Sequence, residues 1–463
     1  MGATPVSPEL RIWQVARRAV PALQRAGLVE LAEPVRRLYR DASSSPLDEP
    51  LASSEWWRRV VGADAAPPPG PGKPVTIVDS GVDVTHPEFA SRPNTTMLND
   101  QELVLDEDDH GTEVGSVVGA PVNGIGIAGV YPQAVFRSWD ASPLGFITTA
   151  GAVRGIVAAA NGGPGVINLS FGGERPDPLI RNAVLYAVRR GSLVVASAGN
   201  EGLTGNPLSY PASYPHVLTV AATAEDGIVS AFSSESVDVD LAAPGQHITV
   251  AEPLSYDPSG YISVSGTSFS APIVAGTAAW VWTSRPQLDN TQLFDVMRMS
   301  AHDLVPAGYD RASGFGLLDI PAALAYPTPP RDPLEPNDDV DEVKPKAIFE
   351  TGQTPLTTPT RGSATVSAGV DRHEDPRDIY RAYVGAGRRL TARTSGDGVE
   401  LRIFPSGARS VVLSTPAAAR TSAGALTVRN ATHRGAYLYV EVLPRASVPR
   451  ASYTLQVSAS ARR

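Results

Sequence analysis

Short apolar runs alternate with longer segments of helical periodicity from Trp56 to Ala325. The short runs are Val75 to Val78, Val166 to Leu169, Leu193 to Ala196 and Val217 to Ala221, and Ile147 to Ala160 is one of the helix-like segments. Because these runs are apolar at successive positions, both faces of each strand must be buried. Strands of this kind separated by helices predict a parallel sheet covered by helices, and we expect an α/β domain at residues 53–326.

The two ends of the chain follow other patterns. Residues 8–40 place apolar side chains such as Ile12, Val15 and Leu23 at spacings of three and four, which predicts a helical N-terminal segment within residues 1–52. Residues 327–346 are rich in proline and acidic residues, so we expect a linker that builds no core.

From residue 347 to the end the apolar residues alternate with a period of two. The runs are Asp378 to Val384, Val399 to Phe404, Gly435 to Val442 and Ala451 to Val457. Glycine, proline and aspartate separate these half-buried strands. The pattern predicts a C-terminal antiparallel β-sandwich at residues 347–463.

Charge and composition exclude several kinds of partner. The net charge is −9, so nucleic acid held through its phosphates is not an expected ligand. There is no cysteine, which excludes disulfides and thiolate chemistry in these 463 residues. The longest apolar stretch, Ala271 to Trp282, is too short to cross a bilayer and predicts a buried helix, and no signal peptide is visible.

Three segments hold the residue types that a nucleophilic serine enzyme needs. Asp79 ends an apolar strand in VTIVDSGVD, His110 precedes a predicted helix in DDHGTEVG, and Ser268 begins the apolar helix in GTSFSAP. Such an enzyme combines a hydroxyl nucleophile, a base and an acid that orients the base. Alone, Asp79 is typical of a turn cap and Ser268 of a helix cap, so only their combination favours catalysis.

DSG, HGT and GTSFSAP, in this order, resemble the three signatures of the subtilisin-like serine peptidases, or subtilases. INLSFGG, SAGNEG, AAPG and YDRASGFGLLD also resemble family segments. The resemblance implies that Ser268 is the nucleophile, His110 the base and Asp79 the carboxylate that orients it. It also implies that Asn200 donates to the oxyanion, so we expect a serine endopeptidase of proteins and peptides that needs no organic cofactor.

Two other functions fit part of the pattern. A non-catalytic binding protein on the same scaffold is the alternative, although Asp79, His110, Asn200 and Ser268 are all present. An α/β-hydrolase esterase would need G-x-S-x-G around its serine, and GTSFS lacks the last glycine.

The resemblance also implies a pocket for the residue before the scissile bond. The candidate lining residues are Ser170, Phe171, Gly172, Ser197, Ala198, Glu201 and Gly202. The glycines leave room for a large side chain, so we expect broad cleavage after large apolar residues. Glu201 favours a basic or amphipathic residue, unless it is a solvated loop glutamate.

NGIGIAG, residues 123–129, matches a dinucleotide-binding pattern but follows a predicted helix, so we exclude nucleotide binding. In subtilases this loop resembles a structural calcium site. The resemblance implies ligands from Glu88 and Asn123, with the carbonyl oxygens of Val122, Ile125 and Ile127. A metal-free loop is the alternative.

The flanking regions resemble parts of exported peptidases. Residues 22–41 are similar to the end of a subtilase propeptide, which implies an intramolecular inhibitor and self-cleavage between Asp41 and Ser54; a packed helical extension is the alternative. EPNDD and the strands after it are similar to bacterial pre-peptidase C-terminal domains. We therefore expect a monomeric, secreted or cell-envelope protein of bacterial type.

Overall fold

The computed structural model describes residues 3–7, 12–15, 19–26, 28, 49–101, 109–305, 307–372, 374–412, 417–421 and 424–460. The chain forms two compact units, Met1–Arg40 and Asp41–Arg463. Of the helices in these ranges, not one has the length and apolar character of a membrane span.

The first unit contains strands where a helix was expected. Strand β1 (Ala3–Ser7) pairs antiparallel with β2 (Ile12–Val15), and the short helix α1 (Val20–Arg25) follows. The helical prediction is wrong for β2, because its β-branched ends and Trp13 favour extended backbone. It is right for α1, which has a proline in its first turn. Residues 29–40 lie outside the described residues.

The second unit begins with a 3₁₀ turn (Ala52–Ser54) and α2 (Trp56–Val60) and then forms the predicted parallel sheet. The sheet order is β4-β5-β3-β6-β7-β8-β9, and every neighbouring pair is parallel. The strands are β3 (Pro74–Asp79), β4 (Thr95–Met97), β5 (Val135–Asp140), β6 (Val166–Leu169), β7 (Leu193–Ser197), β8 (Val217–Thr223) and β9 (Leu241–Pro244). A separate antiparallel pair, β10 (Ile248–Ala251) and β11 (Tyr261–Val264), follows the sheet.

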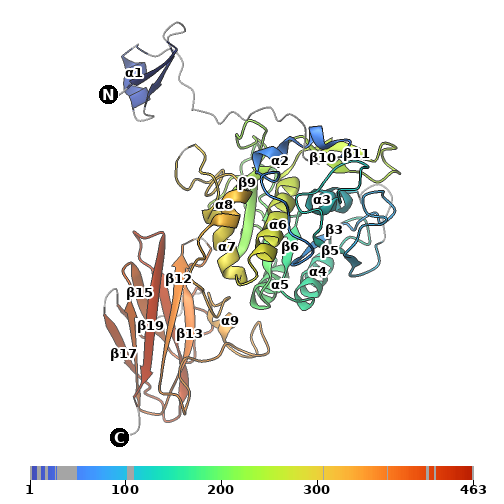
Figure 1. Cartoon of the computed structure of the whole chain (residues 1–463). Helices are drawn as coiled ribbons and strands as arrows, with labels where there is room; N and C mark the ends of the chain where they lie inside the picture. The colour runs from blue at the N-terminus through green and yellow to red at the C-terminus, as the bar shows by residue number, and fades with distance from the viewer. Residues whose placement is uncertain are drawn as a thin grey trace. The chain divides into compact units, whose positions relative to one another are not determined.

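Helices cover both faces of this sheet, as Figure 1 shows. They are α3 (His110–Gly119), α4 (Thr149–Asn161), α5 (Pro178–Arg189), α6 (Thr267–Ser284), α7 (Asn290–Met299) and α8 (Ile320–Ala325). Alternate strand residues point to opposite faces: Ile77 packs in the core with α3, α6 and α7, and Val78 packs with α4 and α5. The apolar stretch expected to form a buried helix is the centre of α6.

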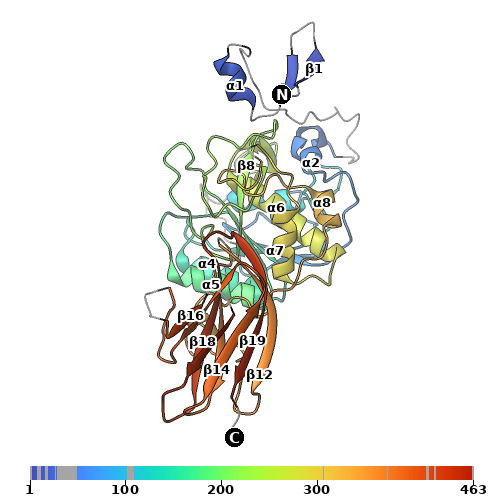
Figure 2. The ribbon, with the colours of Figure 1, turned by 90° about the vertical axis from the view of Figure 1, so that its left-hand side faces the viewer.

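The C-terminal region forms two four-stranded antiparallel sheets, which confirms the predicted sandwich (Figure 2). One sheet has the order β12-β19-β14-β17 and the other β13-β18-β15-β16. Their bounds are β12 (Ser363–Asp371), β13 (Asp378–Val384), β14 (Arg389–Ser395), β15 (Val399–Phe404), β16 (Ala419–Thr421), β17 (Ala425–Arg429), β18 (Ala436–Pro444) and β19 (Arg450–Ala459). Leu390, Leu401 and Leu455 are among the residues of their common core.

The segment expected to be a coreless linker is partly packed. Helix α9 (Val340–Val343) has both valines fully buried, where they join Ile379 and Phe404 in a small apolar cluster. Asn337 is fully buried too, and its Oδ1 accepts a hydrogen bond of 2.7 Å from the Ile379 backbone N–H. Composition alone was misleading here, because the polar residues obtain partners from the sandwich and from the α/β domain.

Candidate active site

The turn after β3 and the start of α3 bring Asp79 and His110 together. Asp79 is 1% exposed, and its Oδ1 lies 2.8 Å from His110 Nδ1. The same oxygen accepts the Ser80 backbone N–H at 2.8 Å, while Ser80 Oγ accepts the Gly111 N–H at 2.9 Å. These hydrogen bonds hold the DSG and HGT motifs together at the carboxyl edge of the sheet.

The electrostatics favour a positive charge on His110. Burial lowers the pKa of this imidazole, but the charge of Asp79 and its hydrogen bond more than compensate and raise the pKa to about 9. Glu113 lies one turn further along α3 and is 5% exposed. Burial raises the pKa of Glu113 to about 8, with His110 acting in the opposite direction. Sequence reasoning missed Glu113 as a residue of the site.

Ser268 lies in the first turn of α6, where backbone N–H groups are unpaired and the helix dipole is positive. Its Oγ donates to the Ser170 carbonyl oxygen at 3.3 Å, and Ser170 Oγ donates to the Ser268 carbonyl oxygen at 2.8 Å. The ring of the next residue, Phe269, lies 5.9 Å from the His110 ring, measured between centroids. The contacts of the described residues include no direct hydrogen bond between Ser268 and His110, which is common in enzymes without substrate.

The amide of Asn200 has a fixed orientation beside Ser268. Its Oδ1 accepts the Thr267 backbone N–H at 2.9 Å and the Thr267 hydroxyl at 3.0 Å. With the oxygen engaged, the Nδ2 group is left to donate elsewhere. Both Asn200 and Ser268 line the same cavity.

This cavity has a volume of about 160 Å³ and includes most of the expected substrate residues. Ser170, Phe171, Gly172, Ser197 and Glu201 line it, while Ala198 and Gly202 do not belong to its lining. Sequence reasoning missed Gly173, Glu174, Gly199, Pro207, Leu208, Ser209 and Thr267. Most of these residues are direct sequence neighbours of predicted ones. Only Pro207, Leu208 and Ser209, in the loop after SAGNEG, lie in no motif that the sequence analysis used.

Glu201 is anchored within the loop that carries Asn200. Its Oε2 accepts the Asn200 backbone N–H at 2.8 Å and the Ser234 hydroxyl at 3.2 Å. Together with Glu174 it gives the cavity two carboxylates beside the apolar surfaces of Phe171 and Leu208. The lining of the cavity is therefore partly apolar and partly acidic.

The expected calcium loop is held by buried carboxylates. Asn123 Nδ2 donates to Glu88 Oε2 at 3.0 Å, and Glu88 Oε1 accepts the Ile127 N–H at 3.1 Å. Glu49, which sequence reasoning missed, accepts the backbone N–H groups of Asn123 at 2.5 Å and of Ile125 at 3.1 Å. Asn123 and Glu88 are therefore in contact, as expected, but the loop presents its N–H groups to the carboxylates, and the predicted calcium site stays a prediction.

These groups fit a hard cation. Glu49 is 7% exposed and Glu88 fully buried, and neither has an ion-pair partner within the described ranges. Burial raises the pKa of Glu88, and the nearby Glu49 contributes in the same direction. The two buried carboxylates are oxygen donors of the kind that Ca²⁺ prefers, and they accept hydrogen bonds from the N–H groups of the loop.

A doubly covered parallel sheet with aspartate, histidine and serine side chains at its carboxyl edge is the arrangement of a subtilisin-like serine endopeptidase. The Subtilase family model matches residues 70–316, so the chain belongs to the subtilase family. It is 34% identical over 257 residues to Subtilisin Savinase of Lederbergia lenta, across 55% of this chain and 91% of that protein. It has the same identity to an alkaline protease of Alkalihalobacillus alcalophilus, across 55% of this chain and 64% of the relative.

Solved structures give the same result. A crystal structure described as MycP1 with the N-terminal propeptide removed is 27% identical, with a TM-score of 0.50. The match covers 59% of this chain and 98% of that one. The protein is therefore a serine endopeptidase by family. The family model covers residues 70–316 and does not describe the segments on either side.

Proposed function

We propose that this endopeptidase hydrolyses peptide bonds through an acyl-enzyme formed on Ser268. The observation that carries the proposal is the 2.8 Å contact between His110 Nδ1 and Asp79 Oδ1, because it leaves Nε2 to act as the base. Asp79 holds the imidazole in the required tautomer and stabilises the imidazolium. The alternative, a non-catalytic binding protein, does not account for this pairing of His110 with the buried Asp79.

In the first half of the reaction His110 Nε2 takes the Ser268 hydroxyl proton as Oγ attacks the scissile carbonyl carbon. The Asn200 Nδ2 group and the Ser268 backbone N–H donate to the oxyanion. The imidazolium then protonates the leaving amine, and the C–N bond breaks. In the second half His110 deprotonates water, which attacks the ester and releases Ser268.

For the substrate, we propose broad cleavage of proteins after large apolar residues. Phe171 and Leu208 supply apolar contacts in the cavity, and Glu174 and Glu201 extend tolerance to side chains with a cationic end. A peptide library with all residues before the cut tests this. A strict preference for aspartate or glutamate would contradict the proposed pocket.

We further propose that the N-terminal segment is a self-cleaved inhibitor of a secreted, monomeric enzyme. Glu49 and the Leu51 N–H, which donates to the Gly126 carbonyl at 2.8 Å, hold the calcium loop. The cut within Asp41 to Ser54 is therefore best placed before Glu49, so that these contacts survive. The C-terminal sandwich is proposed to be a passive or adhesive domain.

One experiment tests the mechanism and the processing together. Purified protein and Ser268→Ala are treated with a fluorophosphonate probe and with unfolded casein, and intact masses are measured. The proposal expects labelling, proteolysis and a shortened N-terminus in the unmodified enzyme alone. Absence of labelling in folded protein would refute the serine mechanism, and labelling with an intact N-terminus would refute self-cleavage.

A further inference from the structure

One sheet of the sandwich, β12-β19-β14-β17, has an outer face of unusual composition. Alternate residues of its strands are buried in the core, so the residues between them point outward. We call these outward residues the hydroxyl face; they are every second residue of 363–367, 389–395, 425–429 and 452–458. Except for Ala425, the face has no apolar side chain, and it has no acidic one.

Serine and threonine form continuous rows across this face. One row of register partners crosses all four strands and consists of Ser363, Ser458, Thr391 and Thr427. The hydroxyl oxygens of Thr391 and Thr427 lie 3.0 Å apart. Because a hydroxyl group both donates and accepts hydrogen bonds, such rows match a ligand that also presents many hydroxyl groups.

The charges on the face are all positive. Arg389 and Arg429 are direct cross-strand partners, although like charges in this position cost stability. Among the ion pairs of the described residues, none includes Arg389, Arg393 or Arg429, whereas Arg402 of the other sheet contacts Glu400 at 2.9 Å. The face therefore keeps a positive charge that the sandwich itself does not neutralise.

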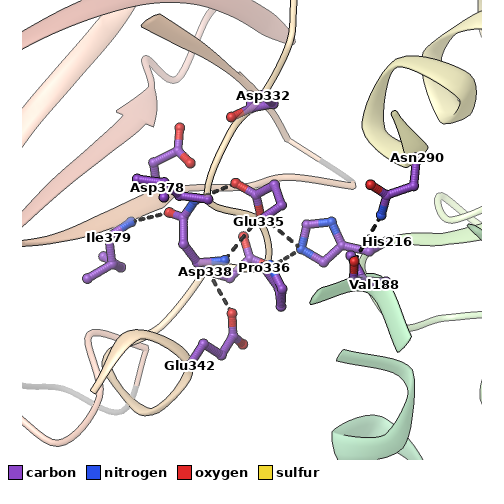
Figure 3. Close-up of polar contacts among 12 residues, drawn as sticks. Val188, His216, Asn290, Asp332, Glu335, Pro336, Asp338, Glu342, Asp378 and Ile379 are labelled. Atoms are coloured by element: carbon purple, nitrogen blue, oxygen red, sulfur yellow. Dashed lines mark hydrogen bonds and ion pairs between the residues drawn. The ribbon is translucent and has the colours of Figure 1, made fainter. Parts of the chain in front are cut away.

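The acidic residues of the C-terminal region lie elsewhere. The Gly369 N–H of β12 donates to Asp332 Oδ2 at 2.6 Å, so the acidic segment meets the sheet at the β12 edge. Figure 3 shows Glu335 and Asp338 of this segment beside His216 of the peptidase domain. The arginines are on β14 and β17, towards the opposite edge of the sheet. In a chain of net charge −9, this separation leaves a local positive patch.

Protection of a sheet edge does not explain the arginines. A charged side chain on an edge strand prevents pairing with other chains, and this accounts for Arg429 on β17. Arg389 and Arg393 lie on β14, which is paired on both sides and needs no such protection. A strand rises about 3.3 Å per residue, so these two arginines are about 13 Å apart, which suits an anion that repeats along a polymer.

We propose that the hydroxyl face binds an acidic polysaccharide. The sugar hydroxyls lie on the serine and threonine rows, and the carboxylates of the polymer pair with Arg389, Arg393 and Arg429. A face without large apolar side chains does not enter a lipid layer, which argues against a membrane as the partner. The inference gives a partner to the adhesive role proposed for the sandwich and rests on that proposal.

Binding is tested on full-length protein with Ser268→Ala, which prevents self-digestion. Calorimetry with alginate, a carboxylated glycan, is compared with neutral dextran and with polyglutamate. We expect alginate to bind in a salt-sensitive way and more tightly than either of the others. Arg389→Gln/Arg393→Gln is expected to weaken alginate binding about tenfold. Arg154→Gln/Arg420→Gln, which removes two exposed arginines outside the face, is the matched control and should bind normally.

The hydroxyl rows are tested separately by Thr391→Val/Thr427→Val, which keeps the shape and the β-branched character of both side chains. This variant should bind alginate more weakly and bind polyglutamate unchanged. Equal alginate binding by the arginine variant and its control, both with normal circular dichroism, would overturn the proposal. Polyglutamate binding as tight as that of alginate, with no effect of the valine variant, would overturn the assignment to a glycan.

The outcome is independent of the peptidase mechanism. Arg389→Gln/Arg393→Gln in the otherwise unmodified enzyme should hydrolyse casein at the normal rate, whether or not alginate binds. Equal binding of dextran and alginate in all variants would keep an adhesive sandwich but refute the acidic ligand and this face.

Discussion

At the scale of single residues, Asn200 has a fixed geometry and a single proposed task. Asn200→Ala removes one oxyanion donor and should lower kcat by about 10²–10³, a magnitude known from subtilisin itself. KM should change little, because the oxyanion forms only in the transition state. Steady-state kinetics on a peptide substrate measure both constants.

The control for this prediction is an exposed change elsewhere, such as Asp397→Asn in the sandwich. Because Asn200 Oδ1 also accepts two bonds from Thr267, the fold of the variant must be compared by circular dichroism. A rise in KM with normal kcat would instead assign Asn200 to substrate binding.

His110 makes the activity depend on pH in a defined direction. The base must be neutral, and its pKa is raised to about 9, so kcat/KM should increase as the pH rises through the alkaline range. Replacing Glu113 by Gln removes a negative neighbour that raises the His110 pKa, so the midpoint should move to lower pH. A pH–rate profile measures the shift.

Glu350→Gln, an exposed change in the C-terminal region, should leave the midpoint in place. A profile of Glu113→Gln that coincides with the unmodified enzyme would show that Glu113 does not act on His110.

At the scale of secondary-structure elements, the contact between α3 and the turn after β3 requires glycine. A Cβ atom added at Gly111 would lie 2.0 Å from the Gly81 carbonyl oxygen. Gly111→Ala should therefore destabilise the protein by about 2 kcal/mol or more and displace His110. Thermal unfolding of inactive protein measures the first effect, and Gly407→Ala, which meets nothing within 4 Å, is the matched control.

The loop at residues 123–129 should respond to calcium. If a cation balances Glu49 and Glu88, Ca²⁺ at 100 times its Kd adds about 2.7 kcal/mol to the free energy of unfolding. Glu88→Gln should remove this response to chelation, whereas Asp397→Asn, an exposed acid of the sandwich, should leave it. Equal melting temperatures of the otherwise unmodified protein with Ca²⁺ and with chelator would argue for a metal-free loop.

Local patterns predicted the elements well and their partners poorly. Strands Val166–Leu169, Asp378–Val384 and Val399–Phe404 have the predicted bounds, because their periodicity is set by burial of neighbouring side chains. Glu49 and Glu113 were not predicted as site residues, since their importance comes from contacts that no local pattern records. The segment at residues 335–343 was mistaken for linker for the same reason.

At the scale of the whole molecule, Arg298 joins the two domains. Its side chain is 4% exposed and contacts Asp295 of the peptidase domain and Asp371 of the sandwich. Arg298→Met leaves buried carboxylates unpaired and should cost about 3–5 kcal/mol of stability. Calorimetric melting of the full-length Ser268→Ala protein measures the loss.

Arg393→Met, on an exposed strand position, serves as the control and should melt normally. If Arg298→Met melts at the same temperature as the control, the domains are held together by other contacts.

Val340 and Val343 precede the sandwich in the sequence and are fully buried, which limits where a C-terminal domain of this kind can be cut and joined to another enzyme. A transplanted C-terminal module would have to start no later than Asp332, because the acidic residues from Asp332 onward and helix α9 pack with the sandwich. A gene fusion that starts at residue 347 would leave Ile379 and Phe404 exposed to water. The segment that must be transferred as one piece is therefore longer than the sandwich itself.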